Sequence, residues 1–167
     1  MKLITYPNDI LKQVMPDFDF SGDVDPLNLE QDMIALMQNS KGIGISANQV
    51  GIVGRVFVIQ PQNLDDKRPF ALFNPVLLDA SEELDQGDEG CLSFPDLYLQ
   101  VKRPKKIKAQ YVDKHQNICI IELSGIDARC FLHELDHLNG ICFTDQVSQL
   151  KLALALKKQR KKNGRTK

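Results

Sequence analysis

The chain has 167 residues, of which 43% are hydrophobic and 26% are charged, and this composition fits one globular domain rather than a disordered chain. It contains no apolar run long enough to span a membrane and no signal-peptide core, so we expect a cytoplasmic protein without membrane contact. The net charge of −1 is unevenly spread. Residues 151–167 hold eight Lys or Arg and no acid, whereas residues 1–150 hold 13 basic and 22 acidic residues.

The first predicted element is a helix from Pro26 to about Asn39. Asp25 is suited to be its N-cap, and apolar residues follow at helical spacing at positions 29, 33, 36 and 37. The next stretch, Gly42–Gly51, is too glycine-rich for a helix and too apolar for a mobile surface loop. We interpret its glycines as positions where a ligand or another segment approaches the backbone closely.

Four strands are predicted in the middle of the chain. Two runs of β-branched and aromatic residues, Arg55–Ile59 and Phe70–Phe73, are bounded by prolines. Two further runs, Ile107–Val112 and Ile118–Leu123, flank a polar segment and predict a hairpin. The acidic stretch Asp85–Gly90 is predicted to be a turn.

Two more helices are predicted toward the C-terminus. Ser124 and Asp127 resemble a capping box at the start of the first helix, which we expect to end near Asn139 and Gly140. The second helix is expected to begin after Ser148 and to run into the basic tail.

Strands in the middle of the chain and helices at three places predict an α+β fold. No linker is long enough to separate two domains. We therefore expect a body of residues 1–150, followed by a basic C-terminal helix and tail of residues 151–167.

The segment His133–His137 reads H-E-x-x-H. Two histidines four residues apart lie on one face of a helix, so both imidazoles can reach a single metal ion. Glu134 lies between them, where a general base for a metal-bound water would lie. Ile126 and Cys130 share the stripe of the two histidines, which indicates a buried site. The motif therefore predicts a metal-dependent hydrolase of acyl bonds.

A tetrahedral catalytic site needs a third protein ligand. The candidates are an acid or one of four residues: Cys91, Cys130, Cys142 and His115. Cys91 stands in a constrained turn between a glycine and a proline, which can aim its thiol at a site. Because no two cysteines form a C-x-x-C pair and nothing indicates secretion, disulfides are not expected. Paired histidines also arise by chance and a single cysteine is more often a core residue, so the metal interpretation depends on several motifs occurring together.

Three segments together resemble the peptide deformylase family. They are Gly42–Gln49 (GIGISANQ), Glu89–Ser93 (EGCLS) and His133–His137 (HELDH), which occur in the order and at the approximate separations of the family's motifs. The resemblance covers about residues 1–150. It implies mixed or antiparallel strands packed around a central metal-binding helix, with an N-terminal and a C-terminal helix. One departure is Leu132, where the family commonly has glutamine before the first histidine.

The resemblance implies one divalent metal ion per chain, bound by Cys91, His133 and His137. Fe²⁺ is the expected ion, and Zn²⁺, Ni²⁺ or Co²⁺ can replace it in purified protein. Glu134 would take a proton from the metal-bound water and later give it to the leaving amine. The side-chain amide of Gln49 and the backbone N–H of Leu92 would stabilise the oxyanion.

The implied reaction removes the N-formyl group from the first methionine of nascent chains and releases formate. The resemblance implies a pocket for the methionine side chain that is lined by Ile43, Ile126, Arg129 (through its stem) and Cys130. Gly44 and Gly90 would let the extended peptide lie against the backbone like an added strand, with Tyr98 along its path.

Two further hypotheses concern charged residues. Arg103 is expected to pair with Glu89, Asp136 or both, and so to join the two segments that carry the ligands. The basic residues 157–162 are suited to contact ribosomal RNA, near which formylated chains emerge, and a solvated terminus is the alternative. We expect the protein to be a monomer.

Two other functions are compatible with parts of the sequence. A zinc endopeptidase would need a third ligand after the H-E-x-x-H motif, and no histidine or acid follows Asp145. A non-catalytic binding module could retain the deformylase fold. The intact set of candidate catalytic and metal-binding residues argues against that alternative, because sequence drift usually damages the base or a ligand first.

Overall fold

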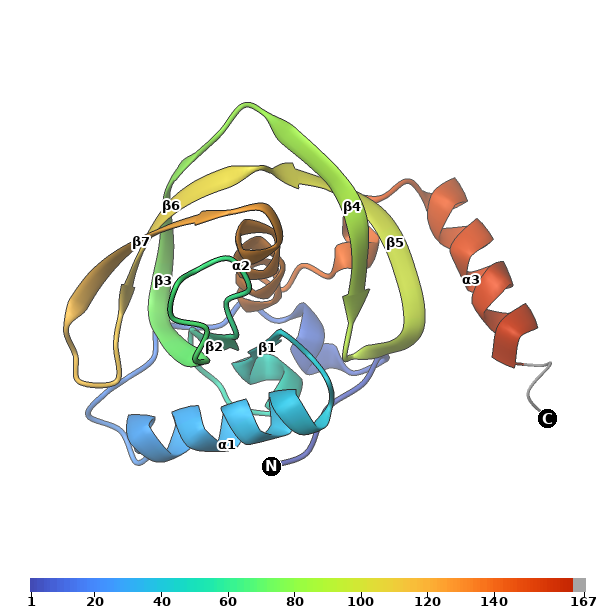
Figure 1. Cartoon of the computed structure of the whole chain (residues 1–167). Helices are drawn as coiled ribbons and strands as arrows, with labels where there is room; N and C mark the ends of the chain where they lie inside the picture. Colours follow the sequence, from blue (N-terminus) through green and yellow to red (C-terminus); the bar gives the residue numbers. More distant parts are fainter. Residues whose placement is uncertain (164–167) are drawn as a thin grey trace.

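Helix α2 (Gly125–Leu138) lies at the centre of the molecule with strands around it (Figure 1). The computed structural model describes residues 1–163, with side chains through Lys161. Helix α1 (Pro26–Asn39) lies along one side, and α3 (Gln149–Asn163) lies at the periphery beside β5 (Figure 1). The predicted α+β fold around a central helix is confirmed.

The larger sheet has five antiparallel strands in the order β1-β2-β3-β6-β7. Its strands are β1 (Gly44–Ser46), β2 (Val56–Ile59), β3 (Phe70–Ala80), β6 (Lys106–Val112) and β7 (Ile118–Ser124). The predicted strand at 55–59 and the predicted hairpin of β6 and β7 are confirmed. Strand β1 forms one edge of this sheet.

Strand β3 is longer than predicted, because it continues through Pro75 to Ala80. Pro75 has no N–H for the ladder, and the register shifts between Phe73 and Val76, so the proline lies in a β-bulge. Asn74 adopts a left-handed φ of 47° there, and its side chain bonds the backbone N–H and carbonyl of Phe18. The prediction ended the strand before Pro75 because it did not allow for a bulge that accommodates the proline.

The predicted turn at Asp85–Gly90 is wrong, because these residues belong to strand β4 (Leu84–Cys91). Strand β4 pairs antiparallel with β5 (Phe94–Pro104), which was not predicted. Residues of β5 alternate between buried and exposed, so a period of two was present in the sequence. Strand β4 has few apolar side chains, so it is stabilised mainly by its backbone hydrogen bonds to β5.

The start of α1 confirms its prediction, since the Asp25 carboxylate accepts from the backbone N–H groups of Leu27 and Asn28. The glycine-rich stretch contains β1 and the 3₁₀ helix η2 (Ala47–Val50), so one turn of helix forms where none was predicted. Two further 3₁₀ helices are η1 (Asp9–Lys12) and η3 (Phe143–Gln146), which contribute the buried residues Leu11 and Phe143 to the core.

Helix α2 begins and ends where predicted, but its start is not a capping box. The Ser124 side chain makes no cap hydrogen bond. The Asp127 carboxylate instead accepts from the backbone N–H groups of Gln62 and Asn63, at 2.7 and 2.9 Å, and so ties the loop after β2 to the helix. Asn139 is the C-cap, and Gly140 has a φ of 70°, which glycine adopts without strain.

The core consists of three clusters of buried apolar residues. One lies between α2 and the larger sheet and contains Phe57 and Phe131 in an edge-to-face pair 5.2 Å apart. The second lies between α1 and the sheet. The third, called the hairpin cluster below, lies under β4 and β5 and consists of Leu11, Phe94, Leu97, Leu99, Val101, Cys142 and Phe143. No helix within the described residues combines the length and apolar character needed to cross a bilayer.

Candidate metal centre and active site

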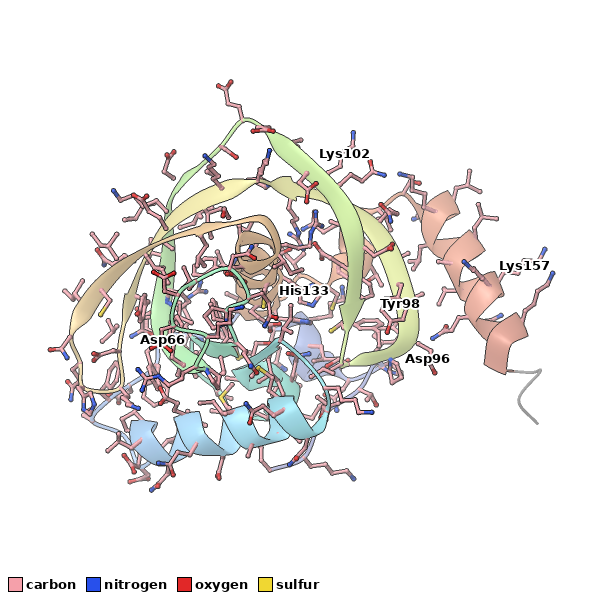
Figure 2. The ribbon with its side chains drawn as sticks, viewed as in Figure 1. Asp66, Asp96, Tyr98, Lys102, His133 and Lys157 are labelled. Carbon is pink, nitrogen blue, oxygen red and sulfur yellow. The ribbon has the colours of Figure 1, made fainter. Side chains whose placement is uncertain are left out.

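Cys91, His133 and His137 come together in space although β4 and α2 are more than thirty residues apart in the sequence (Figure 2 labels His133). One ligand atom from each lies within 4.8 Å of the others, and the Cys91 Sγ is 3.1 Å from the His137 Nε2. One thiol and two imidazoles are a donor set that suits Zn²⁺ or Fe²⁺. Within the described part of the chain, this is the one such group of three ligands.

The other candidates for the third ligand lie elsewhere. The Cys130 Sγ lies 3.4 Å from the Ile43 carbonyl oxygen, and the thiol of Cys142 points to the Leu11 carbonyl within the hairpin cluster. His115 is exposed in the turn between β6 and β7. The geometry therefore selects Cys91 among the alternatives that the sequence leaves open.

Glu89 orients the imidazole of His133. Its Oε2 is 3.0 Å from the His133 Nδ1, which leaves the Nε2 to face the other two ligand atoms. Arg103 holds the same carboxylate with two hydrogen bonds of 2.9 and 3.0 Å, and it also reaches Asp136 on α2 at 2.6 Å. Burial acts to raise the pKa of Glu89, but the hydrogen bonds from His133 and Arg103 lower it to about 2. The predicted pairing of Arg103 with both acids is confirmed.

Arg129 is a second buried arginine in this network, and the sequence did not reveal its partners. Its guanidinium donates to Glu89 at 2.9 Å and to the carbonyl oxygens of Val101 and Asp85. A Cβ at Gly87 would lie 3.1 Å from that guanidinium. Its head group therefore fixes α2 to the hairpin, while the residue still contributes to the cavity wall as predicted.

Glu134 is buried beside the ligands, and its Oε2 has no hydrogen-bond partner in the described structure. A buried carboxylate oxygen without a partner is costly unless a bound group completes its contacts. Burial raises the pKa of Glu134 to about 7, against the opposing effects of His133 and Ser46. A carboxylate with a pKa near neutrality is suited to accept and return a proton.

His137 is fully buried, and its position is fixed through its backbone. The Asn48 side-chain amide donates to the His137 carbonyl at 2.7 Å. Burial lowers the pKa of His137 well below its ordinary value, so the imidazole is neutral, which is the form that binds metals. The donor chemistry and protonation of this residue fit a divalent metal ion.

The side-chain amide of Gln49 has a defined orientation. Its Oε1 accepts from the backbone N–H of Ser46 at 2.9 Å and from the Ser46 hydroxyl at 3.0 Å. Its Nε2 donates to the Ser93 Oγ at 3.0 Å and lies 3.4 Å from the Cys91 Sγ. Because the oxygen is occupied by Ser46, the N–H₂ end must face the metal centre. Ser46 therefore orients the amide.

A cavity of about 620 Å³ opens onto these residues. Apart from His137, which lies beneath it, every residue proposed from the sequence lines this cavity: Ile43, Gly44, Gln49, Gly90, Cys91, Leu92, Tyr98, Ile126, Arg129, Cys130, His133 and Glu134. The sequence did not indicate several others, which are Leu3, Ser40, Lys41, Asp88, Pro95, Asp96 and Leu97. They come from the N-terminal segment, the end of α1 and the β4–β5 hairpin, and no local motif marks them.

At two glycine positions of the cavity, other side chains of the protein occupy the space that a Cβ would need. A Cβ at Gly44 would lie 2.6 Å from the Glu134 Oε1 and 2.7 Å from the Cys130 Sγ. A Cβ at Gly90 would lie 2.7 Å from the Tyr98 ring, which rests across that strand. Close packing of α2 on β1 therefore favours glycine at position 44, where the clashing side chains are buried. At position 90 a Cβ would displace the exposed Tyr98 ring.

The departure at Leu132 lies away from the cavity. Its side chain is buried in the apolar cluster between α2 and the sheet. A leucine fits this apolar position.

The chain matches the polypeptide deformylase family model over residues 1–153. It is 40% identical over 161 residues to a peptide deformylase of Maricaulis maris, covering 96% of this chain and 92% of that protein. Among solved structures, a peptide deformylase from Ehrlichia chaffeensis has a TM-score of 0.86 at 32% identity and covers 99% of this chain and 98% of its own. A peptide deformylase from Synechococcus elongatus, in complex with actinonin, has a TM-score of 0.85 at 35% identity, covering 95% of this chain and 86% of its own.

Proposed function

The chain belongs to the peptide deformylase family and is an enzyme that removes the N-formyl group from newly made proteins; we propose the following roles for its residues in that reaction. One observation carries the assignment. Three metal-ligating side chains, an unpartnered buried carboxylate and an oriented amide converge on one cavity.

Cys91, His133 and His137 are proposed to hold one divalent metal ion, with Fe²⁺ as the working ion and Zn²⁺, Ni²⁺ or Co²⁺ as possible replacements. When bound, the metal lowers the pKa of a water ligand and polarises the formyl oxygen. The distances among the three donor atoms, and the hydrogen bond that fixes the His133 ring, support this assignment.

Glu134 is proposed to be the general base and then the general acid. It would take the proton of the attacking water and deliver it to the methionine nitrogen as the C–N bond of the formamide breaks. Its burial, its raised pKa and its free Oε2 support both roles.

The Gln49 Nε2 and the Leu92 backbone N–H are proposed to stabilise the oxyanion that develops on the formyl oxygen. Gln49 suits this role because it is a neutral donor that does not neutralise the metal. Its hydrogen bonds to Ser46 hold the donor in place before substrate arrives, so reorientation costs little during the reaction.

The methionine side chain is proposed to occupy the part of the cavity that is lined by Ile43, Ile126, Cys130 and the stem of Arg129. The peptide would then extend past Gly44, Gly90 and Tyr98. The free edge of β1 supports such a path, because it offers backbone groups to an extended peptide.

An endopeptidase is not favoured. Such an enzyme was expected to take a third ligand after the H-E-x-x-H motif, whereas the group found here uses Cys91, which precedes it. The intact cavity likewise argues against a binding module without catalysis.

The substrate test compares three peptides with metal-loaded protein: formyl-Met-Ala-Ser, acetyl-Met-Ala-Ser and an unformylated peptide of ten residues. We expect formate from the first alone. Acetate release would show that the cavity tolerates larger acyl groups, and internal cleavage of the long peptide would support the endopeptidase instead. Binding of formyl-Met-Ala-Ser without formate would support the binding module.

A contact with the ribosome is also proposed, through the exposed basic residues Lys157, Lys158, Arg160 and Lys161 of α3. It is compatible with a cytoplasmic monomer that consists of a catalytic body, residues 1–150, and a basic extension. The part of the tail at 164–167 lies outside the described residues. Co-sedimentation with ribosomes should fall steeply as salt rises, and Lys157→Glu with Lys161→Glu should abolish it. Unchanged co-sedimentation of that double variant would rule out the contact.

A further inference from the structure

Helix α3 has one face that packs against the rest of the protein. Leu152, Ala155 and Leu156 pack against the hairpin cluster, and Gln159 follows at the next position of the same stripe. The other face is basic and exposed, and Figure 2 shows Lys157 projecting away from the body. The packed face therefore joins α3 to the hairpin that carries Cys91.

Gln159 makes a direct hydrogen bond to this hairpin. Its Nε2 donates to the Pro95 carbonyl oxygen at 2.6 Å. Pro95 follows Phe94, and Phe94 is the register partner of Cys91 across the tight turn between β4 and β5. Among the described residues, this is the one side-chain hydrogen bond between α3 and β5. It acts on the segment that links the metal centre to the outer wall of the cavity.

The inner end of the turn is held by other groups. The Ser93 hydroxyl donates to the Ile4 carbonyl at 2.8 Å, and the Ser93 carbonyl accepts from the Tyr6 N–H at 2.9 Å. Gln49 also donates to the Ser93 hydroxyl. These contacts do not depend on α3, so loss of Gln159 should leave the metal centre and the oxyanion donors in place.

The outer end has fewer supports. Pro95, Asp96 and Leu97 line the cavity, and Asp96 is exposed with a left-handed φ of 61°. An aspartate in this conformation is uncommon and is maintained by its surroundings. The hydrogen bond from Gln159 to the preceding carbonyl fixes the peptide unit that joins Pro95 to Asp96. This contact therefore supports the outer wall at Pro95 and Asp96, while Leu97 is held by the hairpin cluster.

We propose that Gln159 is a positioning residue for the substrate, acting through Pro95. It holds the wall at Pro95 and Asp96 at the distance at which the peptide beyond the methionine is bound. This inference rests on the proposed deformylase function. Because the wall is remote from the reacting formyl group, Gln159 affects the binding of longer substrates and not the chemical step.

The test compares Gln159→Leu with the parent and with Lys151→Leu, all as full-length, metal-loaded proteins. Leucine keeps the size and helix propensity of glutamine but cannot donate. Lys151 is exposed on the same helix, so its substitution controls for a change of α3 itself. On the proposed peptide path, formyl-Met-Ala is the substrate too short to reach the wall, and formyl-Met-Ala-Ser-Ala is the substrate long enough to contact it.

For Gln159→Leu, we expect the KM for the longer peptide to rise about three- to tenfold, the effect of one lost hydrogen bond. Its kcat, and the KM for formyl-Met-Ala, should stay within about twofold of the parent. Gln159→Lys, which restores a donor of similar reach, should bring the KM back toward the parent value.

Three results would overturn the proposal. They are an unchanged KM for the longer peptide, an equal change in KM for both peptides, and an equal change in KM in Lys151→Leu. If Gln159→Leu does not fold, Gln159→Glu is used instead, because it removes the donor and keeps the side-chain length. The same three KM results would then overturn the proposal. Formate release by the parent protein reports the proposed function separately, so a failure of either idea is distinguishable.

Discussion

Replacing Arg103 by alanine should weaken both the fold and the metal centre. The substitution leaves the Glu89 carboxylate buried after two hydrogen bonds from the guanidinium are lost, and it also releases Asp136 on α2. In the side chains of this pair, only 7% of Arg103 and 3% of Glu89 are exposed to solvent. Bulk solvent therefore does not screen this ion pair, and removing the guanidinium leaves Glu89 poorly compensated.

The free energy of unfolding should fall by about 3 to 5 kcal/mol, which is the usual cost of removing one partner of a buried ion pair. We expect the lower end of that range, because His133 and Arg129 still donate to Glu89. With a urea dependence of about 1 to 3 kcal/mol per molar for a domain of this size, the unfolding midpoint should fall by roughly 1 to 3 M. Metal affinity should fall about ten- to a hundredfold, since Glu89 would hold the His133 ring less firmly.

The assay combines urea unfolding, measured by circular dichroism with and without saturating Zn²⁺, with competition for the metal by a chelator. Lys105→Ala is the matched control, because the Lys105–Glu83 pair is half-exposed and its loss should change stability by less than about 1 kcal/mol. If Arg103→Ala loses no more stability than Lys105→Ala and retains the metal affinity of the parent, the reasoning about the buried network is refuted.

Three other perturbations have defined outcomes. Gly44→Ala should lower the free energy of unfolding by about 1 to 3 kcal/mol, because the new Cβ collides with Glu134 and Cys130. The control is Gly22→Ala, whose Cβ makes only ordinary contacts and should change the unfolding free energy little. Equal shifts of the melting temperature in the two variants would contradict this. Gln49→Ala should lower kcat by about a hundred- to a thousandfold at unchanged metal content, and a loss of metal instead would indicate a structural role. Asp127→Ala should destabilise the protein by about 1 to 3 kcal/mol by freeing two backbone N–H groups, and hydrogen exchange at residues 62–63 would stay slow if that bond did not matter.

The sequence was most informative where a local pattern determines the structure. The Asp25 cap, the helix that carries the two histidines and the β6–β7 hairpin are all readable from spacing and turn residues. The same holds for the histidine pair, because a helix fixes the relation of His133 to His137, whereas Cys91 joins them only through the three-dimensional fold.

The remainder depends on contacts between distant segments. Strand β4 is acidic, and its order comes from pairing with β5 and from the burial of Glu89 between two arginines. The Asp127 carboxylate accepts from the loop after β2 and not from the start of its own helix. No local sequence pattern distinguishes these two sets of partners. The hydrogen bond from Gln159 to Pro95 joins residues 64 positions apart, so the sequence contains no sign of it.

The central claim is that Glu134 moves the proton while Cys91, His133 and His137 hold the metal. The most direct measurement is anaerobic formate release from formyl-Met-Ala-Ser by Fe²⁺- or Ni²⁺-loaded protein, compared with Glu134→Ala, with the metal content of both determined. We predict formate from the parent and none from the variant, at about one metal ion per chain in each. A variant that binds metal and still releases formate at the parent rate would contradict the claim, and so would a parent protein that binds no metal.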